Sequence, residues 1–261
     1  REARSGLARG RERRAVRRVE ALRATYPAHP RAEDAQISLG QYFIDAGETT
    51  RGRRIMERIA REDPDSPNAP RAIYLLGAAE REDGNLDNAA TYFERVLRRH
   101  PDSDIAPAAA YDLASTQVRL ERFEEAAASF ESLARQYPDS PYAQNLGTAV
   151  AEVYYELGQY DRVIEELRPQ IDTLPPEERG RALFFLAESY NQRGDTENAI
   201  VFYRRIIDEP QNDAYLRPAL YGMGWTHLNA DNPDQAADSF ARVRTVATAD
   251  EAQDTLSMKA A

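Results

Sequence analysis

Prolines recur at a fixed interval along this chain, and they constrain its fold more than any other feature. Pro27, Pro64, Pro101, Pro138 and Pro175 are each separated by 37 residues. A unit of this length packs mainly on its neighbours, so a series of units forms one continuous stack. The spacing therefore predicts a repeat array, for which 261 residues is an ordinary length.

Further columns with the same period predict what each repeat contains. A large apolar residue next to a small one, as in Leu76-Gly77, is followed by an Ala-x-x-x-Phe pair, as in Ala89 and Phe93. Residues four apart lie on one face of a helix, and small residues allow two helices to approach closely. Each unit is therefore predicted to be a pair of antiparallel helices. Glycine is expected to supply a left-handed turn between them, at Gly47, Gly84, Gly158 and Gly194, and Glu121 and Asp231 occupy this column in the other two units.

The segments between repeats carry their own signals. Asp-Ser-Pro at residues 65–67 and 139–141 predicts a serine cap followed by proline at the first position of the next helix. The fourth unit departs from the pattern, because Val163 and Gln170 stand where alanine and an apolar residue are usual. We expect looser packing in that unit.

These residues match the signature of the tetratricopeptide repeat family, Leu-Gly-x2-Tyr, Ala-x3-Phe and Pro. The resemblance implies an all-α fold, a right-handed superhelix (α-solenoid) of about six helix–turn–helix repeats of 36–37 residues. The repeats are expected over residues 31–247, after an orphan helix of a preceding partial repeat at 1–30. Residues 248–261 are expected to start a further or capping helix. Because the chain begins with Arg1 and ends within an interrupted helix, we expect it to be a piece of a longer protein.

The run Tyr-Pro-Asp-Ser-Pro-Tyr-Ala at 137–143 is similar to the linkers of bacterial envelope tetratricopeptide proteins. These include the periplasmic protein associated with the Tol–Pal system and the lipoprotein of outer-membrane β-barrel assembly. The resemblance implies the periplasm or the outer membrane, with the cytoplasm as the alternative. No stretch approaches the roughly 18 apolar residues of a membrane span. We therefore expect membrane contact only through an anchor outside this chain.

The chain contains no motif for catalysis or metal binding. Cysteine is absent, which excludes disulfides and thiolate ligands. His29 and His100 fall in the segments between repeats, and His227 falls in a column that is aromatic in other units, so all three have a structural explanation. Phosphate-binding, zinc-protease and nucleophile-elbow motifs do not occur. We expect no enzyme activity, no cofactor and no metal.

Charge is unevenly distributed along the chain. Residues 1–30 contain nine Arg and three Glu, whereas the remaining 231 residues carry a net charge of −16. The basic start is compatible with nucleic acid, but Val16, Val19 and Leu22 leave the apolar stripe of a packed helix. An acidic body does not suit a surface that tracks phosphates. We therefore expect a protein or peptide partner and no nucleic acid.

In the superhelix that the resemblance implies, the first helix of each repeat lines the concave surface. The positions expected to face this groove are rich in aromatic residues and arginine, which are enriched at binding hot spots. Packing against the next repeat explains the tyrosines equally well, whereas Trp225 stands in a column of polar or small residues and favours ligand contact. The candidate binding residues are Arg71, Tyr74, Arg81, Tyr111, Arg119, Tyr155, Arg181, Phe184, Tyr221 and Trp225.

Together these features predict a protein–protein interaction scaffold of the bacterial cell envelope that holds a peptide segment in its concave groove. The alternative is a regulatory or targeting arm of a larger enzyme whose catalytic domain lies outside this chain.

Overall fold

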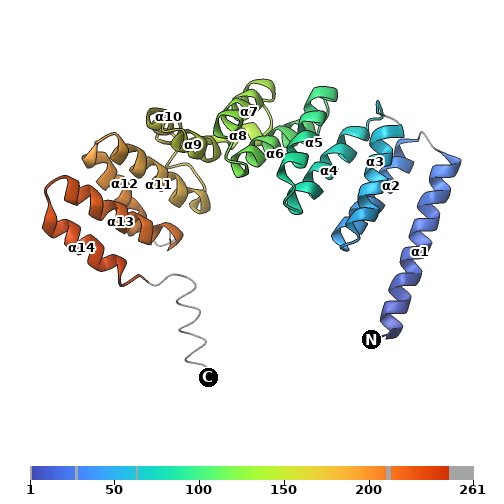
Figure 1. Cartoon of the computed structure of the whole chain (residues 1–261), viewed down its shortest axis with the longest axis horizontal. Coiled ribbons are helices and arrows are strands. Elements are labelled where there is room, and N and C mark those ends of the chain that lie inside the picture. Colours follow the sequence, from blue (N-terminus) through green and yellow to red (C-terminus); the bar gives the residue numbers. More distant parts are fainter. Residues whose placement is uncertain (1, 27–28, 63, 210–212, 247–261) are drawn as a thin grey trace. The chain divides into compact units, whose positions relative to one another are not determined.

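A computed structural model describes residues 2–26, 29–62, 64–209 and 213–246, and these residues contain fourteen helices and no strand. These described residues form two compact units, which are divided between Gln144 and Asn145. Within each unit, successive helices fold back on one another as antiparallel hairpins (Figure 1). The helix expected at residues 248–261 lies outside the described residues.

We call the two helices of each repeat helix A and helix B. The first unit contains α1 (Glu2–Thr25), α2 (Pro30–Asp45), α3 (Thr49–Glu62), α4 (Ala69–Glu82), α5 (Leu86–Arg99), α6 (Ala106–Arg119), α7 (Phe123–Gln136) and α8 (Pro141–Gln144). The second contains α9 (Gly147–Glu156), α10 (Tyr160–Leu167), α11 (Pro176–Gln192), α12 (Thr196–Asp208), α13 (Asp213–Asn229) and α14 (Pro233–Val243). The predicted all-α tetratricopeptide solenoid is confirmed.

The turns between helices A and B follow the predicted column. The four glycines there have φ between 68° and 81°, and Glu121 and Asp231 have φ of 57°. This left-handed conformation is unfavourable for residues with a side chain. The position in the repeat therefore imposes the backbone even where glycine is missing.

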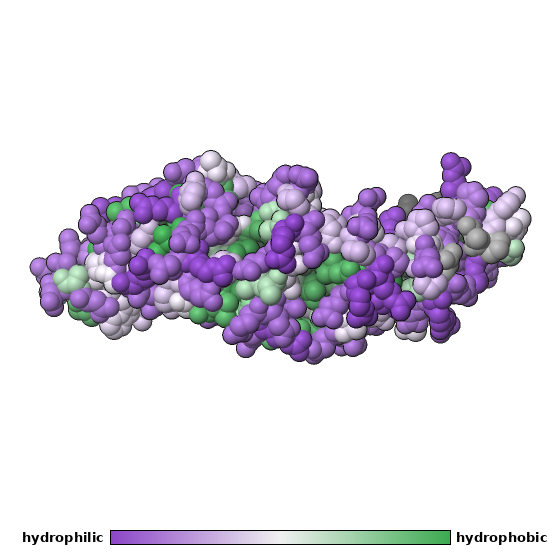
Figure 2. Space-filling view, turned by 90° about the horizontal axis from the view of Figure 1, so that it is seen from above, coloured by the Kyte–Doolittle hydropathy of each residue, from purple (hydrophilic) through white to green (hydrophobic). Residues whose placement is uncertain are grey.

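Large rings of helix B fill the space against helix A. Phe93 and Phe130 are 0% and 1% exposed. A Cβ atom on Gly77 would lie only 2.7 Å from the Phe93 ring, so glycine is required for this close approach. On the face shown in Figure 2, hydrophilic residues dominate and apolar residues appear as small separate patches. The apolar faces of the helices are mostly turned towards their neighbours.

The linker before the second repeat differs from the sequence prediction. Helix α4 begins at Ala69, so the prediction that Ser66 caps a helix starting at Pro67 is wrong. Instead, the Ser66 hydroxyl contacts the buried Glu33 carboxylate of α2 and accepts a 3.1 Å hydrogen bond from the Asn68 N–H. The prediction holds before α8, where Ser140 accepts a 3.1 Å bond from the Ala143 N–H.

Helix A of the fourth repeat is broken into α8 and α9, and the boundary between the two compact units lies at this break. Gly147 starts α9, where any side chain would collide with the Gln170 amide. Helix α10 has only 8 residues, yet Val163 and Leu167 are completely buried. The expected loose packing is therefore not found at Val163, whereas Gln170 is only partly buried and lies beyond the end of α10.

Candidate binding surface

One side of helix A remains accessible in each repeat. On α4, Arg71, Tyr74, Ala78 and Arg81 recur every three or four residues and keep some exposure, whereas most residues between them are buried. We call this side the A-helix face. All candidate binding residues lie on A helices, namely Arg71, Tyr74 and Arg81 on α4, Tyr111 and Arg119 on α6, Tyr155 on α9, Arg181 and Phe184 on α11, and Tyr221 and Trp225 on α13.

Two candidates of the second repeat are held by the third. The Tyr74 hydroxyl donates a 2.7 Å hydrogen bond to Asp112 on α6, and Arg81 donates a 2.5 Å bond to the other oxygen of the same carboxylate. Burial and the bond to Asp112 raise the pKa of Tyr74, so its hydroxyl stays protonated and remains a donor. Tyr74 and Arg81 therefore join two repeats and are only partly available to a partner.

The sequence predictions missed Asp112, which is 8% exposed. A signal was present in the repeat, because Asp112 is the one charged residue in a column of neutral residues. The column consists of Ser38, Leu75, Asp112, Ala149, Phe185 and Gly222.

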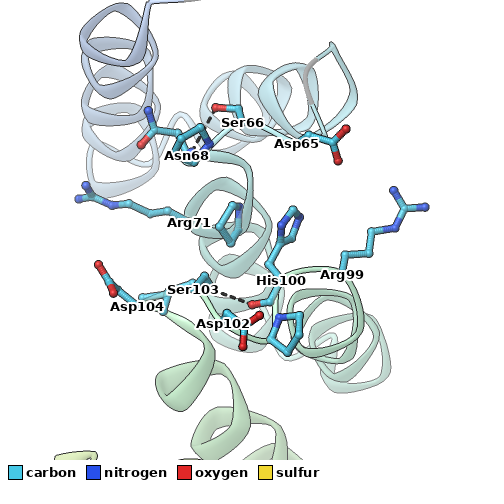
Figure 3. Close-up of a pocket in the computed structure, with 13 residues that line it drawn as sticks. Asp65, Ser66, Asn68, Arg71, Arg99, His100, Asp102, Ser103 and Asp104 are labelled. Carbon is cyan, nitrogen blue, oxygen red and sulfur yellow. Dashed lines mark hydrogen bonds between the residues drawn. The ribbon is translucent and has the colours of Figure 1, made fainter.

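Arg71 lines a pocket of about 700 Å³ formed by residues 65–68, 70–71 and 99–105. Figure 3 shows Arg71 and Asp104 on one side, Asp65 and Arg99 on the other, and the His100 ring between them. The His100 Nε2 atom is buried and has no hydrogen-bond partner. Burial lowers the pKa of His100 and favours the neutral imidazole. The pocket thus presents both charge signs to a ligand.

Tyr111 is a packing residue of the third repeat. Its ring centre lies 6.0 Å from that of Phe130 and 5.6 Å from that of Tyr142 on α8. Edge and tilted contacts at these distances are favourable aromatic packing. Tyr111 therefore contacts both helix B of its own repeat and the following repeat.

The two remaining candidate arginines differ from each other. Arg119, the last residue of α6, is exposed. Arg181 forms an ion pair with Glu152 of α9, and its guanidinium lies 5.9 Å from the centre of the Phe185 ring. Arg181 thus supports the contact between α9 and α11.

A row of half-buried rings connects three A helices of the second unit. Tyr155 lies 5.4 Å from Phe185, Phe185 lies 6.3 Å from Phe184, and Phe184 lies 5.7 Å from Tyr215 on α13, measured between ring centres. Burial and the neighbouring Glu188 raise the pKa of Tyr155 to about 12. Tyr155 and Phe184 were predicted from the sequence but their partners Phe185 and Tyr215 were not, because ring contacts between repeats cannot be derived from one column.

The sixth repeat exposes its aromatic residues. Tyr221 and Trp225 are 52% and 45% exposed, and Leu228, one turn further along α13, is 42% exposed. Both rings stand edge-on to Phe240 of α14, with centres 5.8 Å apart in each case. We call Tyr221, Trp225, Leu228 and Phe240 the sixth-repeat patch. Grouped exposed apolar residues of this kind are typical of interaction sites.

Across the described ranges, no helix has the length and apolarity needed to cross a bilayer. The same residues contain no group of three or more histidine or carboxylate side chains arranged to hold a metal.

Three solved structures have a similar fold to this chain at low sequence identity. MamA from Desulfovibrio magneticus, residues 41 to the end, has a TM-score of 0.59 at 17% identity, over 68% of this chain and 94% of that one. A tetratricopeptide repeat protein from Parabacteroides merdae has a TM-score of 0.57 at 16% identity, over 86% and 96%. YrrB, described as having an unusual peptide-binding site, has a TM-score of 0.59 at 16% identity, over 73% and 93%. These similarities show the fold alone.

Family models give a more specific result. A comparison with curated protein sequences found no match. A tetratricopeptide repeat model matches residues 181–212 and 218–246. The model of the YfiO family, described as outer membrane lipoprotein, matches residues 1–167, which is more than half of the chain. The chain belongs to this family of outer membrane lipoproteins, with tetratricopeptide repeats continuing to its last described helices.

Proposed function

We propose that this protein is a non-catalytic interaction scaffold of the bacterial cell envelope that binds a peptide segment of a partner along the A-helix face. The exposed pair Tyr221 and Trp225 is the observation that carries the proposal. Tyr74 and Tyr111 occupy the same repeat position as Tyr221 but are half-buried against the next repeat. Large aromatic residues that stay exposed can bury substantial area on binding and lose little conformational entropy.

Membership of an outer membrane lipoprotein family supports the envelope as the compartment and favours a scaffold over an arm of an enzyme. The description of YrrB as a protein with a peptide-binding site supports a peptide as the ligand, by analogy of fold. Within the second unit, Tyr155 and Phe184 would extend the contact with ring surfaces on α9 and α11. In the first unit, Arg119 offers an exposed positive charge at the end of α6.

The geometry of the sixth-repeat patch suggests how a partner side chain would bind. Trp225 and Tyr221 are one helical turn apart, and their ring centres are 6.2 Å apart. An apolar side chain placed across them would be desolvated by two rings, and such contacts contribute a few kcal/mol each. Several contacts of this size are sufficient for micromolar affinity.

The proposal can be tested by photocrosslinking from position 228 in extracts of the source bacterium, followed by binding measurements with the captured partner. Trp225→Ala should weaken binding at least tenfold, because it removes about 1–2 kcal/mol or more of buried contact. Its unfolding midpoint should change little. Val201→Ala on α12 is the matched control, since Val201 is 48% exposed but lies on helix B. Binding at full strength by folded Trp225→Ala would remove the sixth-repeat patch from the proposed site.

A further inference from the structure

A second surface with binding character lies among α1, α2 and α3. It is a cleft of about 160 Å³, which we call the α1–α3 cleft. Its floor is apolar and is formed by Val16, Val19, Leu39, Phe43 and Ile55. Its rim carries four guanidinium groups, those of Arg23, Arg51, Arg54 and Arg58. Helix α2 lines this cleft with the side opposite to its A-helix face. The cleft is therefore separate from the A-helix face.

The four rim arginines are unequally neutralised. Arg23 pairs with Glu62 at 2.7 Å, and Arg51 pairs with Glu48 at 3.2 Å. Among the described residues, no carboxylate lies within ion-pair distance of Arg54 or Arg58. Two positive charges at this rim are therefore available to an anionic partner.

Arg58 has one buried donor atom without a partner. One of its terminal nitrogens donates a 2.8 Å bond to the Gln36 side chain, while its Nε atom is buried and has no hydrogen-bond partner. Burial and the positive charge of Arg23 lower the pKa of Arg58, although Glu62 and Glu20 oppose this effect. A bound carboxylate would satisfy this donor and reduce the repulsion between the two guanidinium groups.

A basic rim recurs in the equivalent cleft among α3, α4 and α5, which Arg61, Arg95 and Arg99 line together with the carboxylate of Glu57, but it does not recur in the sixth repeat. A corresponding cleft among α12, α13 and α14 measures about 400 Å³. Its charged lining residues are Arg204, Asp208, Asp234, Asp238 and Arg242, so carboxylates outnumber guanidinium groups there. In the α1–α3 cleft, Glu20 is the one acidic residue among the described lining residues. Exposed arginines on the adjoining α1 add positive charge, at Arg13, Arg14, Arg17 and Arg18.

The size of the cleft limits what can enter it. A cavity of about 150 Å³ holds a benzene-sized group, so a cleft of 160 Å³ holds one apolar side chain. The acyl chain of a phospholipid is several times larger. We propose that the α1–α3 cleft binds an acidic segment of a partner protein, which inserts one leucine or phenylalanine side chain while its flanking carboxylates contact Arg54 and Arg58. This second docking surface goes beyond the proposed function of the A-helix face.

The experiment uses a short fluorescent peptide of Asp and Glu residues around a single Leu, and a matched peptide with Ser in place of Leu. Fluorescence anisotropy at low salt measures binding to the chain. The Leu peptide should bind about tenfold more tightly, because burial of one such side chain is worth about 1.5–3 kcal/mol. The double variant Arg54→Ala/Arg58→Ala should bind the Leu peptide about tenfold less tightly, because it loses both charged contacts.

A control variant removes the same charge elsewhere. Arg98 on α5 and Arg135 on α7 are both exposed, so Arg98→Ala/Arg135→Ala should bind the Leu peptide almost as tightly as the unchanged chain. The Trp225→Ala variant should bind the Leu peptide with unchanged affinity. This result would distinguish the present proposal from the one for the A-helix face. Circular dichroism checks folding. If the double variant unfolds, Arg54→Ala alone serves, because Arg54 is exposed, and a roughly threefold loss is expected.

Three results would overturn the proposal. Equal affinity for the Leu and Ser peptides would show that the apolar floor is not used. An equal loss in the Arg98→Ala/Arg135→Ala variant would show unspecific attraction to net charge. Binding to phosphatidylglycerol vesicles that requires Arg54 and Arg58, without binding of either peptide, would show that this surface contacts membranes instead.

Discussion

The second and sixth repeats both contain a contact between a tyrosine of helix A and a phenylalanine of helix B, but the tyrosine is exposed to a different extent in each. In the second repeat the ring centres of Tyr74 and Phe93 are 5.6 Å apart, and in the sixth those of Tyr221 and Phe240 are 5.8 Å apart. Asp112 of the following repeat holds Tyr74, whereas Tyr221 remains 52% exposed. The repeat pattern thus determines the contact between rings, and the neighbouring repeat determines whether the ring can meet a partner.

The largest expected difference between the two repeats concerns their helix B rings. Phe93→Ala should destabilise the protein by about 3–5 kcal/mol, because Phe93 is completely buried. Phe240 is half-buried, so Phe240→Ala should cost about half as much. Urea unfolding followed by circular dichroism measures both. Equal losses would show that the sixth repeat is packed as tightly as the second.

Removal of Asp112 tests the tie between the second and third repeats. Asp112→Ala leaves the Tyr74 hydroxyl and Arg81 without their acceptor, at an expected cost of about 2–3 kcal/mol. Asp104→Ala is the control, because Asp104 is exposed and its loss should cost less than about 0.5 kcal/mol. If the two variants were equally stable, the shared carboxylate would contribute nothing to stability.

The hydroxyl groups of the two equivalent tyrosines can be compared directly. Tyr74→Phe removes one hydrogen bond to a buried carboxylate and should cost about 1 kcal/mol. Tyr221→Phe removes a hydroxyl from an exposed ring and should leave stability nearly unchanged. Thermal unfolding of both variants provides the comparison. A similar loss in each would contradict the different roles assigned to them.

The second and sixth repeats have different residues at the left-handed turn, so substitutions there should change stability in opposite directions. Gly84 has φ of 81°, so Gly84→Ala should lose about 1 kcal/mol, although a Cβ atom there would meet no neighbour. Asp231 has φ of 57°, so Asp231→Gly should gain up to about 0.5–1 kcal/mol. Denaturant midpoints report both changes. A loss of stability in Asp231→Gly would indicate that the Asp231 side chain has a compensating contact.

The smallest effect concerns pH and arises from His227 in the sixth repeat. Burial and Arg204 lower the pKa of His227, so near pH 6.5 the unfolded chain takes up a proton that the folded protein does not. Stability from this residue is complete at higher pH and is lost as pH falls below about 6.5. His227→Phe places here the residue type that Phe43 provides in the first repeat. When pH is lowered from about 7.5 to about 5.5, Tm should fall less in this variant than in the unchanged protein. An unchanged pH dependence would show that His227 does not contribute.

Much of this fold is predictable from the sequence because it depends on local backbone chemistry. The 37-residue period, the paired helices and the left-handed turn column all follow from residues within one repeat. Glu121 shows how strong this constraint is, since it adopts φ of 57° where glycine is usual. Tyr221 and Trp225 were chosen as binding candidates because both positions were counted from the same apolar column; both rings are exposed, and their contact with a ligand stays a prediction.

Only the tertiary structure decided which of the candidate residues are free. Tyr74 and Arg81 meet a carboxylate more than thirty residues away, and Ser66 meets Glu33 of the preceding repeat instead of capping its own helix. A hydrogen bond between repeats depends on two particular side chains that no periodic pattern specifies. The clustering of Arg54 and Arg58 beside α1 has the same origin, because three helices must pack before their charges can share one cleft.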